Sequence, residues 1–83
     1  MQLTDLPNIG PVLAANLRAV GVETPEQLRE TGACEAFLRI RTQVDSTACF
    51  HQLPALAGAE HGVRKTALSP ETKAELRTFF DSL

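Results

Sequence analysis

The segment that decides the fold of this chain is residues 6–22, LPNIGPVLAANLRAVGV. It reads as a tight turn that leads directly into an α-helix. Asn8 and Gly10 are residue types that tolerate a positive φ angle, as tight turns require. Pro11 suits the first position of a helix, where no backbone N–H is needed. Gly21 is typical of the residue that follows a helix end, so the segment predicts one turn and one helix.

This order of residues resembles the helix-hairpin-helix motif, whose turn follows an apolar-Pro-Gly-apolar-Gly pattern. In that family the turn presents backbone N–H groups to a nucleic-acid phosphate, because a helix N-terminus attracts anions. The matching positions are Leu6, Pro7, Ile9, Gly10, Ala14 and Leu17. Asn8 stands where the first glycine is usual, and Val12 and Leu13 stand where DNA-binding members often carry Lys or Arg.

The length and composition predict one small domain over residues 1–83, with the hairpin motif at 6–21. A hydrophobic content of 43% is enough for a packed core and too high for a disordered tail. The chain has no Trp or Tyr and four Phe, so we expect an aliphatic core. No apolar run is long enough for a membrane span, and no signal-peptide pattern follows Met1. We therefore expect a cytoplasmic protein.

The charge balance argues against tight autonomous binding to DNA. The net charge is −2, and eight basic and ten acidic residues are spread evenly along the chain. DNA affinity depends mainly on Lys and Arg that neutralise phosphates, so a polybasic arm would be expected in a strong binder. Cys34 and Cys49 both lie among apolar residues, and we expect them to be reduced, buried and structural.

Signals for helix starts and ends recur along the chain, and no strand pattern is present. The fold class predicted is all-α, a small helix-hairpin-helix-like bundle of about five helices. Thr24-Pro25 and Ser69-Pro70 are typical helix starts, and Gly32 and Gly62 are typical helix ends. The pattern predicts helices over about 25–31, 33–41 and 70–81.

A further helix is expected around Phe50, Leu53 and Leu56, with Ser46 or Thr47 as its N-cap. Pro54 removes a hydrogen bond within that stretch, so the helix either kinks there or begins late. The apolar spacing continues across the proline, which favours the kink. The core residues predicted from the helical stripes are Leu17, Val20, Leu28, Phe37, Ile40, Phe50, Leu53, Leu56, Leu76 and Phe79.

The spacing of Leu6, Gly10 and Ala14 is repeated by Leu28, Gly32 and Ala36. Helix-hairpin-helix units often occur as two copies that share one core. The repeat is explained equally well by a degenerate second copy, acting as a packing partner, and by chance.

Enzymatic signatures are missing from the sequence, so we expect no catalytic residues, no cofactor and no small-molecule substrate. His51 and His61 are ten residues apart and have no further ligands at metal-binding spacing, so we expect no metal site. The hairpin turn is the one segment for which the sequence suggests a specific function. It either binds a phosphate or only allows two helices to pack closely. The candidate residues for binding nucleic acid or a partner are Asn8, Ile9, Gly10, Val12, Leu13, Arg18, Arg64 and Lys65.

Beyond the hairpin, the whole chain resembles the C-terminal domain of the TfoX/Sxy family of bacterial competence regulators. The resemblance is carried by residues 6–21, 28–40, 53–62 and the segment from Ala67 to Arg77. Pro54 departs from it, because an aromatic or aliphatic residue is more usual there. The resemblance implies a positive regulator of competence-gene transcription, and longer members carry an additional N-terminal domain.

Three interpretations of the function follow. The first is a regulatory domain linked to competence and DNA transformation that contacts DNA weakly through the hairpin turn. The second is a protein-interaction domain that docks on transcription machinery or on a separate TfoX N-terminal-type domain, with Val12, Leu13 and Asn16 as its surface. The third is an accessory domain in DNA repair. A basic surface beside Gly10 would favour the first, and an apolar patch there would favour the second. No interpretation involves a membrane.

Overall fold

The computed structural model describes residues 2–83, and within them it contains five α-helices, two short 3-10 helices and no strand. In chain order the elements are η1 (Leu3–Asp5), α1 (Pro11–Ala19), α2 (Pro25–Thr31), α3 (Ala33–Gln43), α4 (Gln52–His61), η2 (Lys65–Ala67) and α5 (Pro70–Asp81). The all-α class and the number of about five helices are therefore confirmed.

The helix starts that the sequence marks most clearly lie where they were expected. Thr24 Oγ1 accepts a hydrogen bond from the backbone N–H of Gln27 at 3.1 Å, and α2 follows it. Ser69 Oγ accepts from the N–H of Thr72 at 3.1 Å, and α5 follows it. A side-chain oxygen satisfies an otherwise unpartnered amide at each start, which is why these residue types favour the N-cap position.

The expectation of a kink at Pro54 is wrong. Helix α4 begins at Gln52, so Pro54 is its third residue and lies in the first turn. An N–H at that position would have no intrahelical partner, so the missing N–H of proline costs no hydrogen bond there. The expected caps are also wrong, because the Thr47 hydroxyl donates to Asp45 Oδ1 at 2.6 Å in the loop before α4. The N-cap position of α4 is occupied by His51, which makes no side-chain cap.

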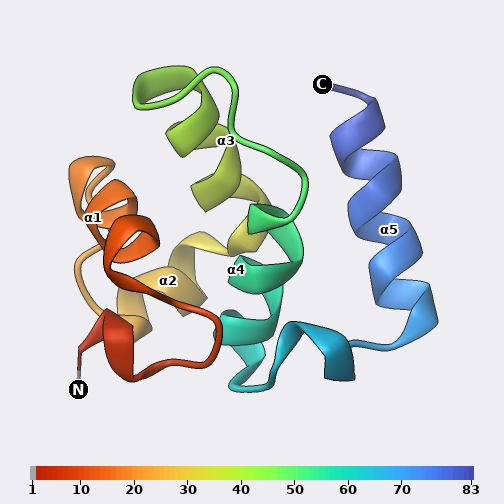
Figure 1. The fold of residues 1–83 in the computed structure, drawn as a ribbon, viewed down its shortest axis with the longest axis horizontal. Helices are drawn as coiled ribbons and strands as arrows, with labels where there is room; N and C mark the ends of the chain where they lie inside the picture. Colours follow the sequence, from red (N-terminus) through yellow and green to blue (C-terminus); the bar gives the residue numbers. More distant parts are fainter. Residues whose placement is uncertain (1) are drawn as a thin grey trace.

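Helix α4 is the centre of the domain. Figure 1 shows it between the group formed by α1, α2 and α3 on one side and α5 on the other. Its residues are buried in every direction, since Leu53, Ala55, Leu56, Ala57, Gly58 and Ala59 all lie in the interior. Small side chains at four of these positions let the neighbouring segments approach its backbone closely. A helix surrounded in this way needs no polar stripe.

The core contains most of the side chains that the helical stripes predicted. Eight of the ten are buried, and the other two, Phe50 and Phe79, are half-buried and pack against the edge of the core. The stripes did not identify Leu3, Leu6, Ile9 and Val22, which lie in or beside turns and are also buried. Within residues 2–83 no polar or charged residue is buried, so the core is held by apolar packing.

The two copies of the internal repeat are buried at the same positions but differ in backbone conformation. Leu6 and Leu28 are buried, as are Ala14 and Ala36. The glycines between them differ, however, because Gly10 has φ −93° whereas Gly32 has φ +84°. The turn between α2 and α3 therefore does not have the conformation of the turn before α1.

The two cysteines are free, but the expectation that both are buried is wrong. Cys34 is half-buried near the start of α3, and Cys49 is exposed. Cys49 lies in the irregular segment between α3 and α4, where its neighbours Ala48 and Phe50 pack in or against the core and its own side chain faces solvent.

Candidate functional site: the hairpin turn and the start of α1

The turn before α1 has one residue with a positive φ, and that residue is Asn8, at φ +69°. Gly10 was expected to tolerate the same conformation, but its φ is −93° and its ψ is −179°, which is extended backbone. A Cβ added at Gly10 would have no atom within 4 Å. The fold therefore requires the left-handed conformation at Asn8, and at Gly10 it leaves open space.

The N-terminus of α1 carries no side-chain cap, because Gly10 occupies the N-cap position. The backbone carbonyl of Gly10 accepts from the N–H of Ala14 at 2.9 Å and thereby begins the helical ladder. Pro11 has no N–H, and the amides of Val12 and Leu13 belong to the first turn, which has no carbonyl before it to pair with. These two amides point along the helix axis toward the open space at Gly10.

The side chain of Asn8 connects this turn to the segment after α4. Asn8 Nδ2 donates to the backbone carbonyl of Val63 at 3.0 Å and to that of Ala55 at 3.4 Å. Asn8 Oδ1 accepts from the backbone N–H of Lys65 at 3.1 Å. Two of the predicted candidates, Arg64 and Lys65, are thus brought beside the hairpin turn although they lie more than fifty residues away in the sequence.

The remaining candidates divide into those at the turn and those away from it. Val12 is 76% exposed, and Leu13 is half-buried. Ile9 is 6% exposed, so its side chain belongs to the core and is not available to a partner. Arg18 is exposed in the last turn of α1, about 9 Å further along the helix axis than Val12. Arg18 therefore does not join the group at the turn.

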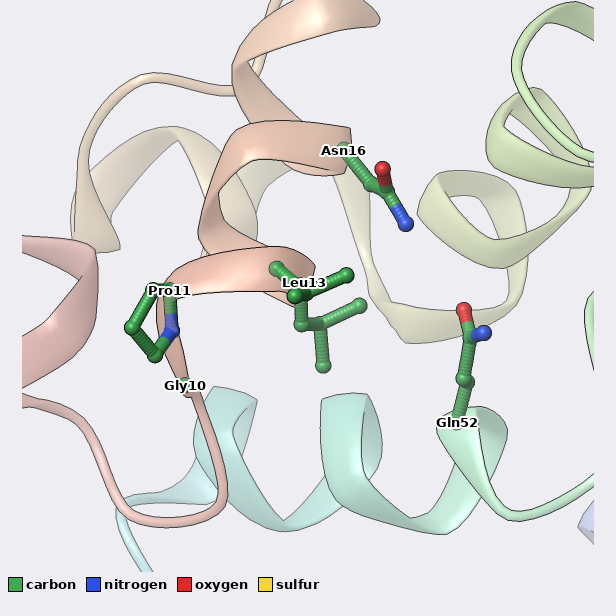
Figure 2. A pocket seen from close by; sticks show the side chains of 6 residues that line it. Gly10, Pro11, Leu13, Asn16 and Gln52 are labelled. Atoms are coloured by element: carbon green, nitrogen blue, oxygen red, sulfur yellow. The ribbon is translucent and has the colours of Figure 1, made fainter.

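An apolar groove runs beside the start of α1, with a volume of about 340 Å³. It is lined by Gly10, Pro11, Val12, Leu13, Asn16 and Gln52. In Figure 2 Leu13 points from α1 into the space above α4, and the Asn16 and Gln52 amides project into it from the two helices. Gln52 was not identified from the sequence, since nothing local relates the first residue of α4 to a turn about forty residues earlier.

Gln52 has an unusual environment within this groove. Its Oε1 atom is buried and has no hydrogen-bond partner in the protein. A buried acceptor without a partner costs free energy, so the Gln52 amide is a locally unfavourable feature of this part of the fold.

Of the five arginines other than Arg64 in residues 2–83, four are engaged by a neighbouring side chain, whereas Arg18, like Arg64 and Lys65, is in no ion pair. Arg29, Arg39 and Arg77 form ion pairs with Glu26, Glu35 and Asp81 at 3.9, 2.9 and 3.3 Å. The guanidinium of Arg41 lies over the Phe80 ring, 5.2 Å from its centroid. Across residues 2–83, Arg64 and Lys65 take part in no ion pair, and both are exposed.

A second cleft, of about 410 Å³, lies between α5 and the start of α3. Its lining includes Cys34, Glu60, His61 and Glu75. Burial raises the pKa of the Cys34 thiol, and the negative charge of Glu60 raises it further, so this thiol is a poor nucleophile. In the part of the chain that the structure describes, no three His, Cys, Asp or Glu residues are grouped closely enough to hold a metal ion. Nor is any helix there long and apolar enough to cross a membrane.

Comparison with known proteins identifies the family of the chain. The family model of the TfoX C-terminal domain matches residues 1–80. The chain belongs to this family. Among curated proteins it is similar to Protein Sxy of Escherichia coli strain K12, with 38% identity over 82 residues. The match covers 99% of this chain and 39% of Sxy, so the chain spans about two fifths of that relative.

Two solved structures share the fold of this TfoX C-terminal domain. One is an uncharacterized protein from Listeria monocytogenes in a triclinic crystal form, with a TM-score of 0.96 and 44% identity, covering 99% of this chain and 92% of that one. The other is a Listeria monocytogenes protein of unknown function in a tetragonal form, with a TM-score of 0.91 and 44% identity, covering 95% and 96%. The arrangement of helices that this chain shares with these two structures extends to nearly every one of its residues.

Proposed function

We propose that this domain is a non-catalytic regulatory module linked to bacterial competence, and that it acts through weak contact between its hairpin turn and the DNA backbone. Membership of the TfoX C-terminal domain family supports the regulatory role. Because the chain spans 39% of Sxy, the activity of the longer relative is itself part of the proposal. The action would take place in the cytoplasm, where DNA is accessible.

The observation that carries the proposal is the uncapped N-terminus of α1. The N-termini of α2 and α5 are closed by Thr24 and Ser69. At α3 the carboxylate of Glu60 accepts from the N–H of Ala33 at 2.8 Å, which places an anionic group at a helix start. Helix α4 also has no side-chain cap, but its first amides, those of Gln52 and Leu53, donate to backbone carbonyls of the preceding turn at 3.2 and 2.9 Å. At α1 the corresponding space beside Gly10 is open. A phosphate oxygen there would accept from the Val12 and Leu13 amides and would be favoured by the helix dipole.

The contact would be weak and would show little sequence preference. Its partners are backbone amides and phosphates, and phosphate contacts carry no direct sequence information. The net charge of −2 offers little general attraction to DNA. Few phosphates would be neutralised, so affinity should fall only shallowly with rising salt.

A second candidate function is docking of another protein in the apolar groove, and a specific observation favours it. Val12 is 76% exposed at the edge of the apolar groove. A partner would supply an apolar side chain that packs against Val12 and Leu13 in the groove. That partner would be a protein of the transcription machinery or a TfoX N-terminal-type domain.

The substitution Val12→Lys separates the two functions. The side chain is exposed, so the fold should tolerate the change, and the new charge would lie beside the proposed phosphate. If DNA is the partner, affinity for a short duplex should rise and the salt slope should steepen by about 0.9. Expression of a competence-gene reporter that depends on this protein should then be kept or increased.

The control is Val44→Lys, which adds the same charge at an exposed valine at the end of α3. It should leave the salt slope unchanged. If Val12→Lys leaves DNA affinity unchanged and abolishes reporter expression, protein docking is the better description. If it changes neither DNA affinity nor expression, both functions of this surface are excluded.

A further inference from the structure

The Asn8 side chain makes all of its hydrogen bonds to α4 and the segment that follows it, and none to its own turn. Its amide nitrogen bonds the carbonyls of Val63 and Ala55, and its amide oxygen bonds the N–H of Lys65. We refer to these three hydrogen bonds as the Asn8 latch. The latch attaches to the backbone on both sides of Arg64, so it fixes the path of the two basic residues.

The latch depends on the absence of a side chain at one position of α4. A Cβ added at Gly58 would stand 2.6 Å from Asn8 Nδ2 and 2.6 Å from the Val63 carbonyl oxygen. Both distances are far below van der Waals contact. Gly62, at φ +74°, then ends α4 and turns the chain back, so that Val63 and Lys65 face Asn8.

The charge distribution gives the latch a use beyond packing. The arginines at positions 29, 39 and 77 are paired with acidic residues on their own helices. Arg64 and Lys65, which the latch holds beside the turn, are exposed and are in none of these pairs. The backbone of both residues is thus held beside the turn that precedes α1.

We infer that Asn8 is a positioning residue for DNA binding: through the latch it holds Arg64 and Lys65 beside the α1 N-terminus, so that amides and cations contact neighbouring phosphates of one strand. The inference rests on the DNA contact proposed above. Holding the segment in place before binding removes the entropic cost of ordering it during binding. Asn8 itself touches no phosphate, because its amide is occupied by the latch.

The test is a double-mutant cycle on the whole chain. Asn8→Gly keeps a residue that adopts a positive φ freely and deletes the latch. Arg64→Gln with Lys65→Gln removes both charges and keeps the latch, which uses only the Lys65 backbone. The readout is the affinity for a short DNA duplex across a salt series, measured by fluorescence anisotropy.

We expect the charge variant to flatten the salt slope by about 0.9 for each phosphate that is no longer neutralised, which is about 1.8 for the two cations together. Asn8→Gly should flatten it by a similar amount. In the triple variant the two effects should not add, because without the charges the latch has nothing to position. Gly58→Ala should reproduce the effect of Asn8→Gly by forcing the latch apart.

Melting temperatures show which variants are folded, and Thr24→Ala is the matched control for reduced stability. It deletes the N-cap of α2 and should lower the melting temperature without changing the salt slope. The inference is overturned if Asn8→Gly leaves the slope unchanged, or if its effect adds fully to that of the charge variant. In that case wild-type binding still supports the DNA contact. If the wild-type chain shows no salt-dependent binding, the proposed DNA contact and the inference both fall.

Discussion

The Phe80 ring lies edge-on against the ring of Phe50, with the centroids 5.4 Å apart and the planes at 76°. Phe80 also approaches Phe37, at 6.0 Å, and carries the Arg41 guanidinium over its face. Leu76 is the one buried residue of α5, so these aromatic contacts are a large part of the attachment of α5 to the rest of the domain.

The substitution Phe80→Ala should therefore loosen α5 selectively. Each aromatic pair contributes about 0.5–1.5 kcal/mol beyond burial, so we expect the free energy of unfolding to fall by about 2–3 kcal/mol. Hydrogen exchange should show less protection in α5 and little change in α4. Phe79→Ala is the control, because Phe79 is half-buried and outside the aromatic cluster. Equally reduced protection throughout the domain would show that α5 does not unfold on its own.

Gly58→Ala should destabilise the fold by about 1–3 kcal/mol, because the new Cβ meets Asn8 Nδ2 and the Val63 carbonyl at 2.6 Å. Alanine normally favours a helix interior by about 1 kcal/mol over glycine, so the sign of the change is informative. Chemical denaturation measures it. A higher stability for Gly58→Ala would mean that the close approach of the hairpin turn to α4 is not rigid.

Gly10→Ser should change stability and DNA affinity in opposite directions. The added side chain has space, and a serine at the N-cap position accepts from an amide of the first turn, which stabilises a helix by a few tenths of a kcal/mol. The same hydroxyl would occupy the proposed phosphate position. We expect a slightly raised melting temperature together with weaker DNA binding. Unchanged or stronger DNA binding would argue that these amides do not contact phosphate.

Glu60→Gln should lower the pKa of the Cys34 thiol, because it removes the negative charge that adds to the effect of burial. Burial is the larger cause, so the pKa should remain above its ordinary value. The pH dependence of alkylation of Cys34 measures this directly, with the exposed Cys49 as an internal reference. Glu35→Gln is the control, because Glu35 does not contribute to the shift. An unchanged Cys34 profile in Glu60→Gln would assign the whole effect to burial.

Helix boundaries could be predicted from the sequence wherever a local signal exists. Thr24 and Ser69 were identified as caps because a cap needs only residues within three positions. The start of helix α4 is predicted less well, because the helix is buried on all sides and its apolar residues therefore do not define one buried face. The role of Pro54 depended on where that helix begins, and no local cap marks its start.

Only those residues of the candidate site that are close together in the sequence could be predicted. Asn8, Gly10, Val12 and Leu13 lie within six consecutive positions, and their turn follows from backbone preferences. The contact between Asn8 and Lys65 spans 57 positions, and the approach of Gln52 to α1 arises from helix packing. The conformation at Gly10 was predicted wrongly because glycine is compatible with extended backbone as well as with a positive φ.

The central place of α4 has a consequence for synthesis of the chain. Helices α2 and α3 pack against residues 52–61, which leave the ribosome only after both helices have emerged. Until then the cluster that contains Leu28, Phe37 and Ile40 lacks the cover that α4 provides, and a nascent chain that stops short of α4 would expose it in part to chaperones and proteases. A truncation inside α4 should thus remove the domain from the cell altogether rather than leave a shortened, partly active one.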